Sequence, residues 1–225
     1  MIDRLALLLT FLCAAVEWLA VGKGWRKVEY FAKPGVMASL FGWLWLAGGL
    51  DGPLLWFGLA ILLSMAGDVF LLFKNEHRWF LFGLGAFLLA HIAYIAGLNL
   101  PPAPLNTLTL GIALFVGMTV FPLIRRILKS LPQKGLRRLV EPVRYYAATI
   151  SLMLFSALVT LFRADWLNTP AYLVSLGAVL FVTSDVILAW NKFVRPIRRG
   201  RLALMVTYHL GQILLVMGAV GQFGM

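Results

Sequence analysis

The sequence predicts an all-α integral membrane protein, a bundle of eight transmembrane helices forming a single domain over residues 1–225. Hydrophobic residues make up 61% of the chain and charged residues only 13%, and the mean hydropathy is +0.89. Apolar runs of about 20 residues, the length that an α-helix needs to cross a bilayer, alternate with short charged loops. No segment of the sequence is long and polar enough to form a soluble domain.

Eight apolar stretches account for the predicted bundle, and their ends define the expected spans. They lie roughly at residues 4–21, 34–50, 53–73, 79–98, 106–124, 142–162, 170–191 and 202–222. Four of them begin at or near a proline, which the first helical position tolerates because its N–H would have no intrahelical partner. These prolines are Pro34, Pro53, Pro142 and Pro170.

The first stretch is interpreted as an uncleaved membrane helix. Its charged start and apolar run have the outline of a signal peptide, but Glu17 interrupts the region where cleavage is expected. The only cysteine, Cys13, lies in the same stretch, which excludes a disulfide framework and a cysteine-based metal site.

The basic residues give the predicted orientation. Of the twenty Lys and Arg residues, only Arg4 and Arg163 fall on one side of the predicted bundle, and the others lie in four loops on the opposite side. The positive-inside rule places these four loops in the cytoplasm, so the expected protein is a multi-pass protein of the inner membrane with both termini outside. The net charge of +11 is therefore a topology signal, and no nucleic-acid partner is expected.

Two acids inside the predicted spans are the main functional candidates. Asp68 lies in the third span and Asp185 in the seventh, both in the pattern small-Asp-Val-apolar-Leu-apolar. Burying an ionisable side chain in a bilayer costs about 2.5–3.5 kcal/mol on insertion scales, so such a residue usually has a function. Counting from the cytoplasmic loops places both acids about 9–10 Å inside the boundary, with Glu17 at a similar depth. The alternative is that each acid is a buried polar anchor between helices.

A weak internal repeat accompanies the two acids. Residues 63–72 align with residues 180–189 at an offset of 117, and His91 aligns with His209 at an offset of 118. The matched helices run in the same direction, so the repeat suggests a parallel duplication of four helices about an axis along the membrane normal.

Further polar residues are expected to line the same site. His91 and Tyr94 share one face of the fourth helix, and Tyr208 and Gln212 lie at helical spacing on the eighth. Two His and two Asp could ligate a metal, but no dense motif such as H-E-x-x-H is present, so no metal is expected. Lys33 precedes a predicted helix start, where anions are favoured, and is a candidate for binding a lipid headgroup phosphate.

Together these motifs resemble the YhhN-like lysoplasmalogenase family of membrane proteins. The resemblance spans nearly the whole chain and ends in a Ser184-Asp185 motif; Glu17 has no counterpart in the family pattern. The matching residues are Lys33-Pro34, Ser64, Gly67-Asp68, Gly83-Leu84, Ala86 to His91, Tyr94, Tyr146, Met153, Gly177-Ala178, Phe181, Ser184-Asp185, Leu188-Ala189, Tyr208 and Gln212.

The resemblance implies an enzyme that hydrolyses the vinyl ether bond of a lysoplasmalogen, a lysophospholipid of the bilayer, without a cofactor. The products are a fatty aldehyde and glycerophosphoethanolamine or glycerophosphocholine. Asp68 and Asp185 are expected to be the acid/base pair, with the identity of the acid left open. The expected positioning residues are His91, Tyr94, Tyr146, Ser184, Tyr208 and Gln212. The alternative is a small proton-coupled transporter or channel whose intramembrane acids relay protons.

Overall fold

The structure is a computed structural model that describes residues 2–73 and 77–224, and the described residues form helices and no strands. Lys74, one of the bases used to predict the orientation, lies outside the described residues. The helices are α1 (Ile2–Lys23), α2 (Arg26–Gly48), α3 (Pro53–Leu72), α4 (His77–Leu98), α5 (Thr107–Gln133), α6 (Val140–Val159), α7 (Asn168–Ala189) and α8 (Gly200–Phe223). Three short segments adjoin them: η1 (Arg137–Leu139), η2 (Thr160–Phe162) and η3 (Trp190–Val194). The predicted all-α fold class is confirmed.

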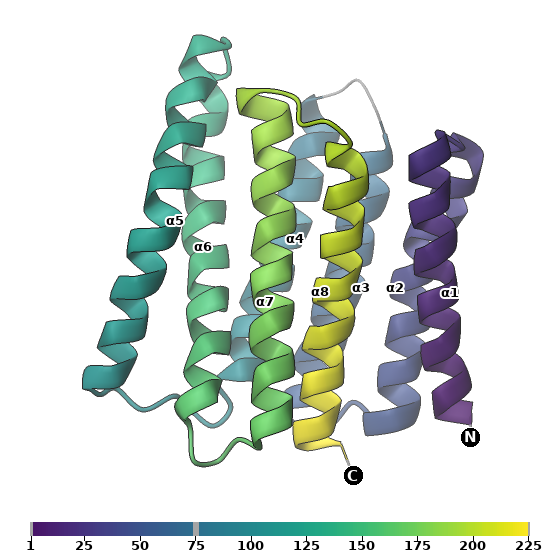
Figure 1. Cartoon of the computed structure of the whole chain (residues 1–225), viewed down its shortest axis with the longest axis vertical. Coiled ribbons are helices and arrows are strands. Elements are labelled where there is room, and N and C mark those ends of the chain that lie inside the picture. The colour runs from purple at the N-terminus through teal and green to yellow at the C-terminus, as the bar shows by residue number, and fades with distance from the viewer. Residues whose placement is uncertain (1, 74–76, 225) are drawn as a thin grey trace.

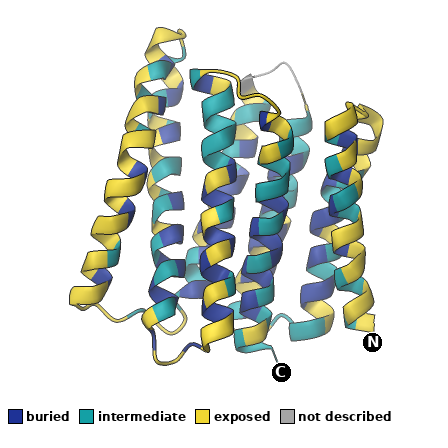
Figure 2. Cartoon of the chain, in the orientation of Figure 1, coloured by how far each residue is buried: buried dark blue, intermediate teal, exposed yellow. Residues whose placement is uncertain are grey.

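Seven helices within the described residues are long and apolar enough to cross a membrane: α1, α3, α4, α5, α6, α7 and α8. Their outward faces are apolar, and Figure 2 shows exposed residues over most of α5. Apolar side chains in that position suit contact with lipid tails, whereas in water they would be costly. The chain is therefore a multi-pass membrane protein.

The helix α2 differs from the span drawn from the sequence. It begins at Arg26, two turns before residue 34, so Pro34 lies inside the helix. The apolar pattern could not reveal these first turns because they carry Arg26, Glu29 and Lys33. Glu29 and Lys33 are nevertheless buried, 4% and 7% exposed, because their side chains enter the interior of the bundle.

The helix α5 also extends past its predicted end at residue 124. Asn106 and Thr109 form a reciprocal capping box at its start, with hydrogen bonds of 3.0 and 2.9 Å. The helix then continues to Gln133 and carries the bases that follow residue 124 on its last turns. Figure 1 shows α5 at the edge of the bundle, with its C-terminal end projecting beyond the neighbouring helices.

Small residues bring α7 and α8 into close contact. A Cβ atom on Gly177 would lie 2.6 Å from the backbone nitrogen of Leu215, and one on Gly211 would lie 2.8 Å from that of Phe181. Glycine is needed at both positions because the two backbones approach each other directly. Figure 1 shows these two helices side by side at the front of the bundle and both chain termini at one end of it.

Candidate active site

Asp68 is buried in α3 and both of its carboxylate oxygens have partners. The Lys33 ammonium of α2 lies 2.9 Å from Oδ1, and the Tyr208 hydroxyl of α8 donates a 2.7 Å hydrogen bond to Oδ2. The carboxylate is 1% exposed, so the ion pair with Lys33 is what keeps its charge tolerable inside the bundle. Asp68 is thus a paired carboxylate.

Asp185, in α7, has a different environment. The Tyr146 hydroxyl of α6 donates a 2.7 Å hydrogen bond to Oδ2, and Nε2 of His91 in α4 lies 3.2 Å from the same oxygen. The Nε2–H tautomer of His91 satisfies this contact and leaves Nδ1, which has no partner among the described residues, as a bare acceptor. No hydrogen bond to Oδ1 of Asp185 occurs within residues 2–73 and 77–224, so this oxygen is available to a ligand.

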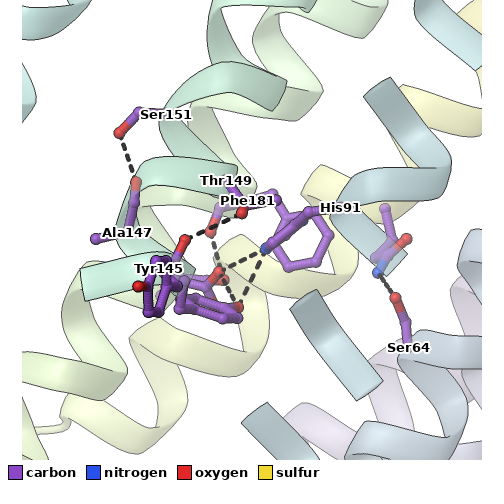
Figure 3. Close-up of polar contacts among 11 residues, drawn as sticks. Ser64, His91, Tyr145, Ala147, Thr149, Ser151 and Phe181 are labelled. Carbon is purple, nitrogen blue, oxygen red and sulfur yellow. Dashed lines mark hydrogen bonds and ion pairs between the residues drawn. The ribbon is translucent and has the colours of Figure 1, made fainter. Parts of the chain in front are cut away.

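A separate set of hydrogen bonds, apart from the contacts of His91, links α3, α4 and α8. The Tyr94 hydroxyl donates to Oε1 of Gln212, and Nε2 of Gln212 donates a 2.9 Å hydrogen bond to the Ser64 hydroxyl. Figure 3 shows His91 with its dashed contacts and Ser64 apart from them, held by its own hydrogen bond. All three side chains are fully buried, so they fix the relative positions of α3, α4 and α8.

The two aspartates line one polar cavity with a volume of about 400 Å³. Their charges are close enough to interact. The cavity contains four acids and four bases, and its other polar lining residues include Ser184 and Tyr208. The charged residues are Glu17, Arg26, Glu29, Lys33, Asp68, Asp185, Lys192 and Arg201.

A second, almost entirely apolar cavity of about 70 Å³ adjoins the first. It lies between α4, α5, α6 and α7, and its lining includes Ile124, Val143 and Ile150. Among residues 2–73 and 77–224, Asp185 is the only charged residue that borders it. Leu71, Phe87 and Leu188 line both cavities together with Asp185. The Asp185 carboxyl therefore lies where a polar chamber meets an apolar one.

The structure brings together most of the residues predicted for the site. Lys33, Asp68, Ser184, Asp185 and Tyr208 line the polar cavity. Tyr146 and His91 contact Asp185, which lines this cavity. Ser184 donates a 2.7 Å hydrogen bond to the Phe181 carbonyl in its own helix. The predicted Tyr94 and Gln212 do not line the cavity; they bind each other behind it.

Five further charged residues of the cavity were not predicted as site residues: Glu17, Arg26, Glu29, Lys192 and Arg201. Arg201 of α8 lies 2.6 Å from Oε2 of Glu29, and Glu17 of α1 lines the same chamber. The spacing of Glu29 and Lys33, four residues apart, would have placed both on one face of α2 had the helix been drawn from Arg26. Within the described residues, no three His, Cys, Asp or Glu side chains lie close enough to hold a metal ion.

Comparison with known proteins shows which family the chain belongs to. The model of the YhhN family matches residues 28–219. The chain belongs to the YhhN family. It is 30% identical over 209 residues to the Mus musculus protein named lysoplasmalogenase TMEM86B, covering 92% of this chain and 82% of that protein.

Two other relatives are also named lysoplasmalogenases. The Sus scrofa lysoplasmalogenase TMEM86B is 32% identical over 156 residues, covering 69% of this chain and 59% of that protein. A Mycobacterium tuberculosis protein named lysoplasmalogenase is 31% identical over 164 residues, covering 72% of this chain and 59% of that protein. No solved structure matches this chain. The predicted family resemblance is thus confirmed, and the catalytic roles of individual residues remain predictions.

Proposed function

We propose that this YhhN-family protein is a membrane hydrolase that cleaves the vinyl ether bond of a lysoplasmalogen with Asp185 as the general acid. The relatives described above are named lysoplasmalogenases, which supports a hydrolase of this type. None of those three names describes a transporter, and the comparisons do not favour the proton-coupled alternative.

The observation that carries the proposal is the position of Asp185 between the two cavities. A lysoplasmalogen joins a long apolar alkenyl chain to a polar glycerophospho headgroup, and the vinyl ether is the junction between them. If the part of the alkenyl chain next to the vinyl ether enters the apolar cavity and the headgroup occupies the polar one, the vinyl ether lies beside Asp185. Its Oδ1 atom is free of other hydrogen bonds within the described residues, as a proton donor to substrate must be.

In the first step, a proton on Oδ1 of Asp185 passes to the β-carbon of the enol ether. The carbon–carbon double bond supplies the electrons, and an oxocarbenium ion forms at the adjacent carbon. Tyr146 and His91 both hold Oδ2, so they fix the orientation of the carboxyl and stabilise the negative charge that it acquires. Asp68 adds a second negative charge near the developing cation.

In the second step, a water molecule from the polar cavity attacks the oxocarbenium carbon and returns a proton to Asp185. The resulting hemiacetal breaks its bond to the glycerol oxygen, which takes the hydroxyl proton as the aldehyde forms. The balance is one lysoplasmalogen and one water to one aldehyde and one glycerophospho alcohol. Lys33 lies 2.9 Å from Asp68, so in this scheme Asp68 acts as a fixed carboxylate.

The proposed substrate enters from the inner leaflet. The polar cavity is bordered by Arg26, Lys192 and Arg201, which belong to the base-rich loops that the positive-inside rule assigns to the cytoplasm. A headgroup phosphate at that level would meet these cations, and the alkenyl chain would extend toward the middle of the bilayer.

The test is aldehyde release by the full chain purified in detergent, with 1-alkenyl and 1-alkyl lysophospholipids as substrates. Only the alkenyl ether can accept a proton at carbon, so the alkyl ether should be inert and turnover should slow in D₂O. Asp185→Asn should lower the rate by about 10²–10⁴-fold, the usual contribution of general acid catalysis. Asp165→Asn, in the connection between η2 and α7, is the control. Turnover like that of the wild type in Asp185→Asn refutes the proposal.

A further inference from the structure

The polar cavity contains two acids with a carboxyl oxygen that the protein leaves unsatisfied. Glu17 of α1 is 1% exposed and Glu29 of α2 is 4% exposed. Oε2 of Glu17 and Oε1 of Glu29 have no hydrogen-bond partner among the described residues. Buried polar atoms are almost always paired, and a buried carboxyl oxygen without a donor costs free energy, so these two atoms require an explanation.

Their surroundings point to a missing cation. Both acids line the polar cavity, and two of its four bases are already engaged: Lys33 pairs with Asp68 at 2.9 Å and Arg201 pairs with Oε2 of Glu29 at 2.6 Å. An ammonium group of a ligand in this cavity would supply N–H donors to these unpartnered oxygens.

Two basic side chains, Arg26 and Lys192, border the same cavity at other positions. Arg26 lines it without an ion pair among the described residues, and the Lys192 ammonium, 4.3 Å from the centre of the Phe80 ring, has no carboxylate partner there. Those cations suit a phosphate group. The chamber thus offers two acids that each have one unpartnered carboxyl oxygen, and two bases without a carboxylate partner among the described residues, a pattern that a zwitterion complements.

We infer that Glu17 and Glu29 form a binding subsite for the ammonium group of a zwitterionic lysophospholipid headgroup, with Arg26 and Lys192 facing its phosphate. The inference rests on the proposed function, because it assigns the headgroup half of the same cavity. It gives Glu17 a role in substrate selection and none in the chemical step.

The experiment compares two 1-alkenyl lysophospholipids, one with an ethanolamine and one with a glycerol headgroup, on the wild type and Glu17→Gln. The variant keeps the shape of the side chain but removes its charge. KM for the ethanolamine substrate should rise about tenfold, the cost of one charge-assisted hydrogen bond, with kcat unchanged. The glycerol substrate has no ammonium group and should be unaffected. Glu141→Gln is the matched control, because Glu141 is an exposed acid paired with Arg144 outside the cavity.

An unchanged KM for the ethanolamine substrate in Glu17→Gln, or an equal rise in KM for both substrates, overturns the inference. Binding of the non-cleavable 1-alkyl ethers separates this inference from the proposed reaction. If the wild type hydrolyses neither alkenyl lipid but binds the ethanolamine ether more tightly than the glycerol ether, and Glu17→Gln removes that difference, the subsite stands and the proposed function fails. If Glu17→Gln does not fold, the wild type decides alone: equal affinity for the two ethers overturns the inference.

Discussion

Removing the Asp68 charge should destabilise the protein strongly, because the Lys33 ammonium would lose its counter-ion in a buried position. Lys33 is 7% exposed and lies 2.9 Å from the Asp68 carboxylate. In Asp68→Asn the Tyr208 hydroxyl can still donate to the amide oxygen, so the change isolates the charge. Breaking a buried pair by removing one partner costs about 3–5 kcal/mol. For a domain of this size, that lowers the unfolding temperature by roughly 10 °C.

The measurement is thermal unfolding of the purified chain in detergent, followed by tryptophan fluorescence. A double variant, Asp68→Asn with Lys33→Met, removes both charges and should recover most of the lost stability, because no uncompensated charge remains. The control is Glu141→Gln. Glu141 and Arg144 are 57% and 56% exposed at their side chains, and such surface pairs contribute about 0–1 kcal/mol.

Two outcomes would refute this reasoning. If Asp68→Asn unfolds at the wild-type temperature, the Lys33 ion pair does not stabilise the bundle. If the double variant is no more stable than the single variant, the loss came from packing and not from an unpaired charge. Because Asp68 is proposed to stabilise the cation during the reaction, the double variant should regain stability without regaining activity.

Two further predictions concern other contacts. Tyr146→Phe removes the 2.7 Å hydrogen bond to Asp185 but keeps the ring, so aldehyde release should fall about tenfold without loss of fold; an unchanged rate would exclude a positioning role for the hydroxyl. Outside the membrane spans, hydrogen bonds from the Arg163 guanidinium lower the pKa of Asp165 below its ordinary value of 3.8. Stability from this pair should be complete above pH 3.8 and lost as the pH falls through the lower folded pKa. Asp165→Asn should flatten that dependence of the unfolding temperature, and an unchanged acid profile would contradict the assignment.

The sequence could predict that the acids lie at one level of the bundle because a helix rises 1.5 Å per residue from each charged loop. Glu17, Asp68 and Asp185 were expected at one level, and all three line one cavity. The sequence could not predict the direction in which each side chain points, because helix rotation is set by packing. Tyr94 and Gln212 were expected in the cavity wall, but they hydrogen-bond to each other and do not line the cavity.

Some residues of the cavity were not predicted from the sequence, and the reason is related. Apolar runs locate the lipid-crossing part of a helix, and the charged turns of α2 before residue 34 lie outside that pattern. The sequence therefore could not predict the ion pair between Glu29, which is buried, and Arg201, which is exposed. Contacts between helices distant in the chain, such as His91 with Asp185, depend on tertiary packing and leave no local signal.

The contacts of the two aspartates also bear on the proposed duplication of four helices. Asp68 in α3 binds Tyr208 in α8, and Asp185 in α7 binds His91 in α4, so each acid is tied to the second helix of the other pair. Asp185 follows Asp68 by 117 residues, and Tyr208 follows His91 by the same 117. The partner of His91 in the proposed repeat is therefore Tyr208, one residue before the His209 that the sequence pattern suggested.

The same offset of 117 residues points to different surroundings, and so to different proposed roles, for the two acids. It pairs Lys33, which neutralises Asp68, with Ile150, which lines the apolar cavity beside Asp185. One half of the proposed repeat thus supplies an ammonium group where the other supplies an aliphatic wall. An ammonium group favours the charged form of a carboxyl beside it. If Asp185 is the acid, as proposed, Ile150→Lys, which would add an ammonium group to the apolar wall near Asp185, should abolish aldehyde release even in a folded protein.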